Sequence, residues 1–550
     1  MATEKKNNSD FLIQGSILAM ASIISRIIGL IYRVPLTNIL GDKGMDLYGA
    51  AYEIYNILLL ISSYSLPLAV SKLVASRLSK GERTNAYRVF RGALLFAFIT
   101  GSIASLIVFF FAHPLTVLLA TESSYLALRV LGPTLLIVAI MGVIRGFFQG
   151  MGTMVPSAIS QIIEQLVNAI VSVVAAYTLF QYGVRVGELL DSGESKGYEF
   201  GAAGGTLGTG CGALAALLFL CLVFFAFRRR FTKKMKFETK RTHESYRSIF
   251  RILILTIVPV LLSTTVYNIS SILDQGLFKN IALFQGYSAE EVSTWWGIFT
   301  GKYKTLINVP IALASAMAAS CVPSITGAHI IGNTKLVLRK IESSLRFVML
   351  LAFPCAVGLA VLASPILQLL FSDSRAMSAL MIQVGVISVL FYSISTLTNA
   401  VLQGIDHMAE PVKNAAIALV LHLLILVGMM FVLNLNIYAV ILSNAIFALI
   451  MCLLNGRSIR KYVPYRQEMQ KTFLIPLISS LMMGVATYFA YTLTMQLCNI
   501  NALSTIFAIF VAFLVYGIAI TRLHGVTESE LRSFPKGTAL VRIFKKLHLM

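Results

Sequence analysis

Basic side chains inside long apolar stretches are the residues of this sequence with the most distinctive chemistry. Arg26 lies near the middle of the apolar stretch 11–40, about 20 Å of helix from either end, which is farther than its side chain can reach. Ser22, Gly29 and Arg33 recur on the same helix face. Because a guanidinium donates paired hydrogen bonds to phosphate, this pattern predicts a site for an anionic substrate group. The basic residues predicted to bind it are Arg26, Arg33, Arg145, Lys302 and Lys304.

Three acids lie within apolar stretches and allow two interpretations. Glu53, Glu164 and Asp274 either pair with the basic groups or hold a coupling cation, H⁺ or Na⁺. The residues alone leave both open. None of the six cysteines forms a CxxC pair, so no metal site and no disulfide framework is predicted. No cofactor is expected other than a coupling cation.

Uncharged polar side chains recur at helical spacing in several of the same stretches. One such row usually forms hydrogen bonds between helices, whereas several rows in both halves of the chain are better explained by a shared hydrated chamber. Asn56 and Asn308 are predicted to contact the substrate there. The other uncharged polar residues predicted to line the chamber are Gln161, Gln165, Asn168, Asn268, Tyr392, Asn399 and Gln403.

The elements that must position these residues are membrane-spanning helices. The 550 residues are 57% hydrophobic and only 13% charged, which is too little charge to cover the surfaces of soluble domains. A span needs about 20 mostly apolar residues, and fourteen stretches meet this length. They are 11–40, 48–74, 92–112, 124–148, 155–180, 202–227, 250–276, 298–322, 345–370, 378–402, 411–433, 436–455, 472–496 and 500–521. The sequence therefore predicts an all-α polytopic membrane protein with 14 transmembrane helices.

The basic residues also predict the orientation of these spans. With the N-terminus inside, the inner segments hold 33 of the 45 lysines and arginines, and the outer loops hold five. This distribution follows the positive-inside rule and predicts that both termini are cytoplasmic. The net charge of +21 is therefore attributed to membrane orientation, and no nucleic acid partner is expected.

Two parts of the chain repeat each other. Arg145 and the pair Gln149-Gly150 correspond to Asn399 and Gln403-Gly404 at an offset of 254 residues. Each copy has an even number of spans, so the copies have the same orientation and predict a transporter with its site between two lobes. The predicted domains are an N-lobe (1–227), a basic cytoplasmic linker (228–249), a C-lobe (250–455), and a final helix hairpin with a cytoplasmic tail (456–550).

Three segments support more limited predictions. The linker is basic with interleaved aromatic residues, which is typical of a segment on anionic membrane lipid. Gly204, Gly208 and Gly212 recur every four residues, which predicts close helix packing. The stretch 472–521 contains no charged residue or histidine, so it cannot line an ionic pathway; it either packs as a scaffold or faces a lipid tail.

Short motifs along the chain resemble one transporter family. They are Ser25-Arg26-Ile27-Ile28-Gly29, the prolines Pro67 and Pro310, Val322-Pro323-Ser324, and the two Gln-Gly pairs already named. Together they resemble the MurJ-like lipid II flippases and the YtgP and SpoVB polysaccharide-biosynthesis proteins of the MOP exporter superfamily.

This resemblance implies a MOP/MATE-like fold of two six-helix lobes plus a C-terminal helix pair. It implies a flippase, not an enzyme, that moves an undecaprenyl-pyrophosphate-linked precursor such as lipid II from the inner to the outer leaflet of a bacterial plasma membrane. Arg26 matches the family's first-span arginine, Asp46 resembles its acid after that span, and Lys304 is adjacent to the position of its later arginine. The implied partners are the lipid-linked oligosaccharide, membrane lipid and the cell-wall synthesis machinery.

Two other functions are weighed against a flippase. A cation-coupled multidrug exporter of the same superfamily would favour twelve spans and an acidic cavity. A membrane glycosyltransferase or polymerase should present catalytic carboxylates on a sizeable outer loop. The longest outer loops here have only about 20 residues, and their acids Glu188, Asp191 and Glu194 are typical of a solvated surface.

Overall fold

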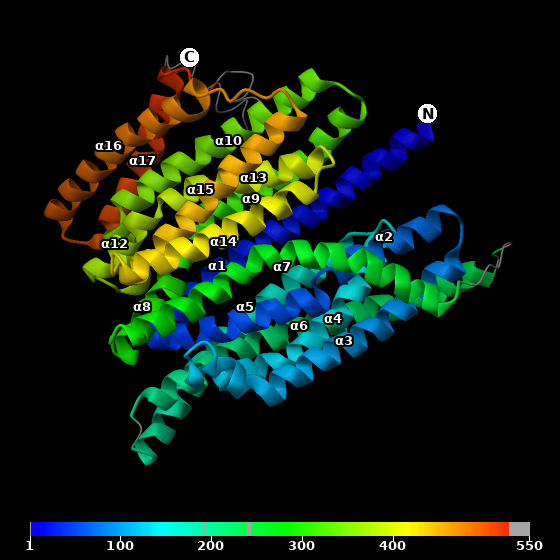
Figure 1. The fold of residues 1–550 in the computed structure, drawn as a ribbon, viewed down its shortest axis with the longest axis horizontal. Coiled ribbons are helices and arrows are strands. Elements are labelled where there is room, and N and C mark those ends of the chain that lie inside the picture. Colours follow the sequence, from blue (N-terminus) through cyan, green and yellow to red (C-terminus); the bar gives the residue numbers. More distant parts are fainter. Residues whose placement is uncertain (1, 192, 237, 239–243, 527–550) are drawn as a thin grey trace. The chain divides into compact units, whose positions relative to one another are not determined.

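The computed structural model describes residues 2–191, 193–236, 238 and 244–526, and every regular element in these ranges is a helix. This confirms the predicted all-α class. The chain divides into two compact units, Met1–Gly301 and Lys302–Met550, whereas the predicted lobes meet at the linker 228–249. The predicted domain boundaries thus stay a prediction, and each compact unit is described by itself below (Figure 1).

Eleven helical runs in the described residues are long and apolar enough to cross a membrane. The first run, Met20–Ser79, has 60 residues and would extend about 90 Å as one straight helix, although the apolar layer of a bilayer is only about 30 Å thick. This run therefore holds two of the predicted spans. The predicted total of fourteen stays a prediction.

The helices of the first unit follow one another along most of its length. In chain order they are α1 (Ala2–Leu59), α2 (Leu66–Ser79), α3 (Arg83–Val117), α4 (Tyr125–Gly150), α5 (Val155–Leu189), α6 (Ser195–Lys236), α7 (Tyr246–Phe284) and α8 (Ala289–Ile298), with a π-helical turn at Leu60–Tyr64 and a 3₁₀ turn at Glu122–Ser124.

The long helix α1 consists of two helices that meet at Gly41. This residue has φ 62° and ψ −172°, a conformation open essentially only to glycine. The hydroxyl oxygens of Tyr32 and Tyr48 are 3.5 Å apart, although sixteen residues of straight helix would separate them by about 24 Å. The chain therefore reverses direction at Gly41, between the first two predicted spans.

Glycines let α6 lie directly against α5. A Cβ atom on Gly204 would meet the carbonyl of Ala175, one on Gly208 would meet Ser172, and one on Gly212 would meet the carbonyl of Glu164. No larger side chain fits at these three positions without moving a helix. The close packing predicted from the four-residue glycine spacing is confirmed.

The second unit contains the remaining helices. They are α9 (Lys304–Ile330), α10 (Thr334–Val361), α11 (Ala363–Phe371), α12 (Ala376–Gly385), α13 (Ile387–Gly404), α14 (Ala409–Phe431), α15 (Asn436–Tyr462), α16 (Ile475–Cys498) and α17 (Asn501–Arg522), with a π-helical turn at Gln470–Leu474. A further π-helical turn, Phe299–Tyr303, contains the boundary between the two units. Helices α16 and α17 pack on each other, and α16 also lies along α10, so the predicted final hairpin joins this unit.

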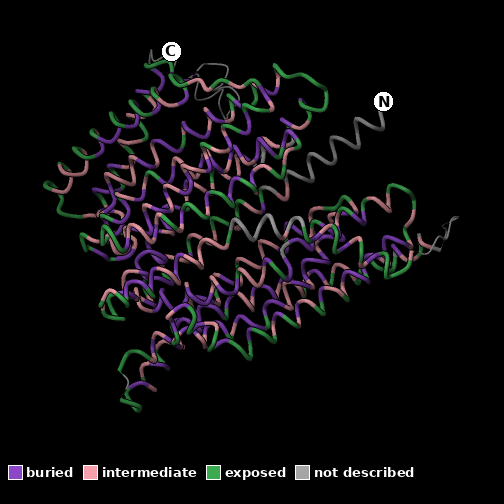
Figure 2. Tube along the Cα trace, viewed as in Figure 1, coloured by how far each residue is buried: buried purple, intermediate pink, exposed green. Residues whose placement is uncertain are grey.

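The two units repeat one packing arrangement. Helix α4 packs on α2, α3 and α6, and its sequence counterpart α13 packs on α9, α10 and α15. Proline positions agree as well, because Pro67 in α2 and Pro310 in α9 each follow a π-helical turn. Exposed residues form long outer faces on the helices (Figure 2), and many of these residues are large and apolar, as lipid contact requires.

Candidate functional site

A polar contact joins α1 to α5 beside Arg26. The Ser22 hydroxyl donates to Oε1 of Gln161 at 3.1 Å, and a Cβ atom on Gly29 would lie 3.6 Å from Oε1 of Gln165. Arg26 lies one turn from Ser22 on the same helix face, and it is exposed. The structure thus places Arg26, on a predicted membrane-spanning helix, next to a row of amide side chains on α5.

Arg145 on α4, also predicted to bind the substrate, forms an ion pair within the first unit. Its Nη2 donates to Oε2 of Glu164 at 2.7 Å, and its Nε donates to Oγ of Ser160 at 2.8 Å. The two charged side chains are 12% and 21% exposed. This contact matches the ion-pair interpretation of Glu164, and it leaves less of the Arg145 charge available to an anionic ligand.

A tyrosine cluster surrounds Arg33, another of the arginines predicted to bind the substrate. Tyr32, Tyr48 and Tyr52 from the two halves of α1 lie near Arg33. Nδ2 of Asn168 on α5 donates to the hydroxyl of Tyr32 at 3.4 Å. These side chains connect the predicted residues Arg33 and Asn168 through phenol groups.

This tyrosine cluster is absent from the sequence prediction. The spacing of Tyr48, Tyr52 and Tyr55 places all three on one helix face, which was the available signal. Hydroxyls of Tyr52 and Thr209 also form a hydrogen bond, so the cluster reaches α6.

The acids Glu53 and Asp274 lie on α1 and α7. Glu53 accepts a 2.7 Å hydrogen bond from the hydroxyl of Ser271, and Asp274, almost one turn further along α7, is 3% exposed. Asn56, predicted to contact the substrate, and Asn268, predicted to line the chamber, are exposed on the same two helices. One acid with a neutral partner and a second buried acid thus lie on two helices of one unit.

The predicted acid Asp46 forms a buried ion pair close to the reversal of α1. Its Oδ1 lies 2.5 Å from Nζ of Lys279 on α7, and both side chains are 2% exposed. Lys279 also donates to Thr121, and the other Asp46 oxygen accepts from Ser293 on α8. These contacts fasten three segments of the first unit to the turn at Gly41.

In the second unit, Lys302 is likewise held by an acid. Its Nζ lies 2.6 Å from Oδ2 of Asp373, and the side chains are 8% and 4% exposed. Arg375 and Ser378 donate to the same carboxylate. Burial alone would raise the pKa of Asp373, but the hydrogen bonds from Arg375, Lys302 and Ser378 outweigh it and lower that pKa. Lys302 therefore stabilises a loop charge in this structure.

The other predicted residues of the second unit do not all lie together. Lys304 is half-buried, whereas Asn308 and Gln403 are exposed. Asn399 accepts a 2.7 Å hydrogen bond from Asn455, and Tyr392 donates to Asn444 at 3.1 Å. Asn399 and Tyr392 thus form hydrogen bonds between helices, as one of the two interpretations of the polar rows expects.

Neither unit shows a metal centre within the part of the chain that the structure describes. No group of three or more histidine, cysteine, aspartate or glutamate side chains lies close enough together there to hold an ion.

The helices define an all-α polytopic membrane protein, and its fold is shared with solved transporters. The solved structure of a lipid II flippase MurJ in an inward closed conformation superposes with a TM-score of 0.67 at 14% identity, covering 92% of this chain and 98% of that one. An inward-facing multidrug resistance MATE family transporter of the MOP superfamily gives 0.63 at 16% identity, covering 82% and 98%. At such identities these likenesses concern the fold.

Sequence comparison identifies the family. The family described as polysaccharide biosynthesis protein matches residues 12–329, and the chain belongs to it. The lipid II flippase MurJ of Bacillus subtilis (strain 168) is 25% identical over 493 residues, 87% of this chain and 88% of that protein. The stage V sporulation protein B of the same organism is 25% identical over 453 residues, 82% and 83% of the two chains. The resemblance found in the sequence is confirmed.

Proposed function

We propose that this protein is a flippase for an undecaprenyl-pyrophosphate-linked cell-wall precursor, with lipid II as the first substrate to test. It moves this lipid from the inner to the outer leaflet by alternating access. Two facts support the proposal. The chain belongs to a family named for polysaccharide biosynthesis, and its relative over 87% of its length is a lipid II flippase.

The single observation that carries the proposal is the position of Arg26. A charge in the middle of a membrane helix is costly unless a wet cavity or a partner compensates it, and Arg26 is exposed beside the amide row of α5. A pyrophosphate needs a cation of this kind to cross the apolar layer. We assign the pyrophosphate contacts first to the arginines of α1, Arg26 and Arg33, because a guanidinium donates paired hydrogen bonds to phosphate.

The cation that drives the cycle is proposed to bind at Glu53 and Asp274. Both acids belong to the first unit, on α1 and α7, and the carboxylate of Glu53 accepts a hydrogen bond from the hydroxyl of Ser271 on α7. H⁺ and Na⁺ are the two candidates. The H⁺ gradient and the Na⁺ gradient are collapsed separately in vesicles, and we expect only one of these treatments to stop transport. Transport by E53Q should not depend on that gradient.

A cation-coupled multidrug exporter is the second candidate, because the fold is shared with MATE transporters. The additional helices α16 and α17 and the arginines of α1 favour the lipid-linked anion instead. Transport of organic cations by the purified protein, with none of lipid II, would decide for the exporter.

The test of the flippase proposal is depletion in the native bacterium, followed by measurement of lipid-linked precursors in each leaflet. The precursor that accumulates in the inner leaflet identifies the substrate among peptidoglycan, capsule, teichoic acid and spore-cortex intermediates. We further propose that the protein lies in the plasma membrane with both termini in the cytoplasm and the cell-wall synthesis machinery as its partner.

Complementation of the depleted strain then tests Arg26. We expect R26A to insert and fold but to fail in translocation, and R185A, which removes an exposed arginine from the far end of α5, to restore it. Normal outer-leaflet precursor in cells that rely on R26A would refute the assignment.

A further inference from the structure

One face of α6 presents a continuous apolar stripe. Leu214, Leu218, Leu222 and Phe225 are between 44% and 71% exposed, and their spacing of four, four and three residues places them on one face. Helix α6 belongs to a run that is apolar enough to cross a membrane. Large exposed apolar side chains on such a helix contact acyl chains.

The same face continues directly into cations. Arg229 follows Phe225 by four residues, Lys233 follows Arg229 by four, and both are exposed. Four residues of helix rise about 6 Å, so Arg229 lies about one turn beyond the last apolar side chain. Lipid phosphates occupy this depth, just outside the acyl chains.

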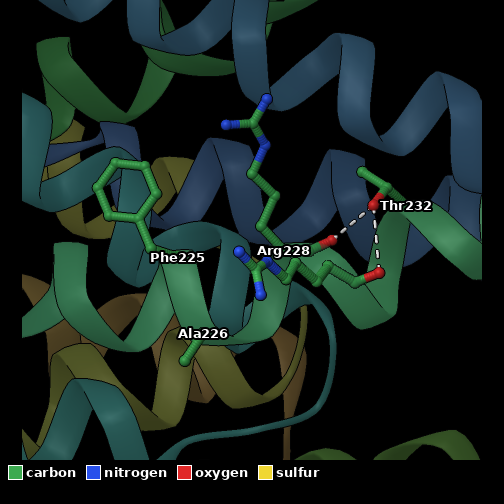
Figure 3. Close-up of a pocket in the computed structure, with 5 residues that line it drawn as sticks. Phe225, Ala226, Arg228 and Thr232 are labelled. Atoms are coloured by element: carbon green, nitrogen blue, oxygen red, sulfur yellow. Dashed lines mark hydrogen bonds between the residues drawn. The ribbon is translucent and has the colours of Figure 1, made fainter.

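A cavity of about 610 Å³ lies at this transition. Its lining residues all come from α6: Phe225, Ala226, Arg228, Arg229 and Thr232. The hydroxyl of Thr232 donates to the carbonyls of Arg228 and Arg229 at 2.9 and 3.2 Å, as Figure 3 shows beside the guanidinium groups and the Phe225 ring. The hydroxyl therefore satisfies the helix backbone, and the guanidinium groups supply the donors of the cavity.

Two other cations of the first unit, Arg77 and Arg88, have partners within the protein. Arg77 makes two hydrogen bonds to Glu244, and Arg88 donates to the carbonyl of Glu244 and lies over the ring of Tyr246. Within the residues that the structure describes, no carboxylate pairs with Arg228 or Arg229. The two guanidinium groups at the cavity are thus unneutralised by the described part of the protein.

We propose that this end of α6 binds an anionic phospholipid. The headgroup phosphate contacts Arg228 and Arg229, and an acyl chain lies along Phe225 and the leucine stripe. The site is separate from the transported cargo and does not depend on the proposed flippase function.

The experiment places a reporter at the cavity. F225W is introduced into the full chain, which otherwise contains only Trp295 and Trp296, and the protein is reconstituted in phosphatidylcholine vesicles. Brominated phosphatidylglycerol and brominated phosphatidylcholine are then compared as quenchers at equal content, with the unsubstituted protein as background. We expect phosphatidylglycerol to quench the new tryptophan preferentially, by about fivefold for each arginine.

Two charge-matched variants distinguish a site from general attraction to the membrane surface. R228Q/R229Q should abolish the preference for phosphatidylglycerol. R339Q/K340Q removes two exposed cations from α10 and should retain it. Equal preferences in both variants, or equal quenching by the two lipids, would overturn the proposal.

A competition and a label-free count complete the test. Inorganic phosphate should leave the quenching unchanged, because the stripe makes the acyl chain part of the ligand; displacement by phosphate would overturn the assignment to a lipid. Native mass spectrometry of the protein without F225W should find fewer retained phosphatidylglycerol molecules on R228Q/R229Q than on R339Q/K340Q. Equal numbers on the two variants would contradict the site.

Discussion

Nζ of Lys279 lies 2.5 Å from Oδ1 of Asp46, although 233 residues separate the two in the chain. The pair closes the first unit where α1 reverses, since Asp46 follows the turn at Gly41 and Lys279 lies near the end of α7. Both side chains are almost fully buried, so each charge depends on the other for compensation.

Removing one partner of this pair should therefore destabilise the fold. D46N or K279M leaves one buried charge unpaired, which typically costs about 3–5 kcal/mol, whereas the double variant D46L/K279M should lose less than either single one. Denaturation in detergent measures these changes. The exposed pair of Lys43 and Glu290 supplies the control, because E290Q should cost no more than about 1 kcal/mol of unfolding free energy. If D46N and K279M lost as little stability as E290Q, the interpretation would be contradicted.

The packing of α6 on α5 predicts a strong effect of side-chain size. A Cβ atom at Gly208 would meet Ser172, so G208V should force the helices apart and cost about 1–3 kcal/mol or more. Gly456 on α15 is the matched control, because a Cβ atom there would meet no other atom within 4 Å and G456A should be neutral or slightly stabilising. Equal shifts in the melting temperatures of G208V and G456A would contradict this account.

The carboxylate of Asp373 predicts how stability depends on pH. Its pKa is lowered in the folded protein, so near pH 4 the unfolded chain binds more protons than the folded one, and stability rises with pH. The stabilisation is present above the unfolded pKa of about 3.9 and is lost as the pH falls through the folded value. Each tenfold change in the acid dissociation constant of this carboxyl corresponds to about 1.4 kcal/mol of stability.

Melting curves between pH 3 and pH 7 test this dependence. The wild type should lose stability at the acidic end by more than D373N, which lacks the titrating group. S293A, which removes a hydrogen bond to the other buried acid, should keep the wild-type slope. Parallel pH profiles for the wild type and D373N would be inconsistent with the lowered pKa.

The repeat was predicted from matching motifs 254 residues apart. Hydropathy and helical spacing predicted the helices and the close packing at the glycines, because these depend on residues within one or two turns of helix. They could not predict which helices meet. Lys302 carries the signal of a membrane-depth cation, but its partner Asp373 lies 71 residues away in a loop. Likewise, the spacing of Tyr48 and Tyr52 defines a face, whereas only the reversal at Gly41 brings that face to Tyr32.

Comparison of the two copies of the repeat also distinguishes the residues that the fold needs from those that it does not need. Pro156 at the start of α5 corresponds to Pro411 at the start of α14. In that register Gln161, Glu164, Gln165 and Asn168 correspond to apolar residues. These are Ala416, Leu419, Val420 and Leu423. Since the second copy forms the same kind of helix with apolar residues at these four positions, the amide row of α5 is an addition to the fold and a candidate for substrate contact.

Exchanging these residues between the copies tests that conclusion. Q161A/Q165V gives α5 the residues of α14, so the protein should fold with a nearly unchanged melting temperature, while precursor translocation falls about tenfold for each lost hydrogen bond of about 1.4 kcal/mol. V420A, which trims the counterpart of Gln165 on α14, should transport at the wild-type rate. If Q161A/Q165V instead transported normally and melted at a lower temperature, the amide row would serve only to join α1 and α5 through contacts such as the one between Ser22 and Gln161.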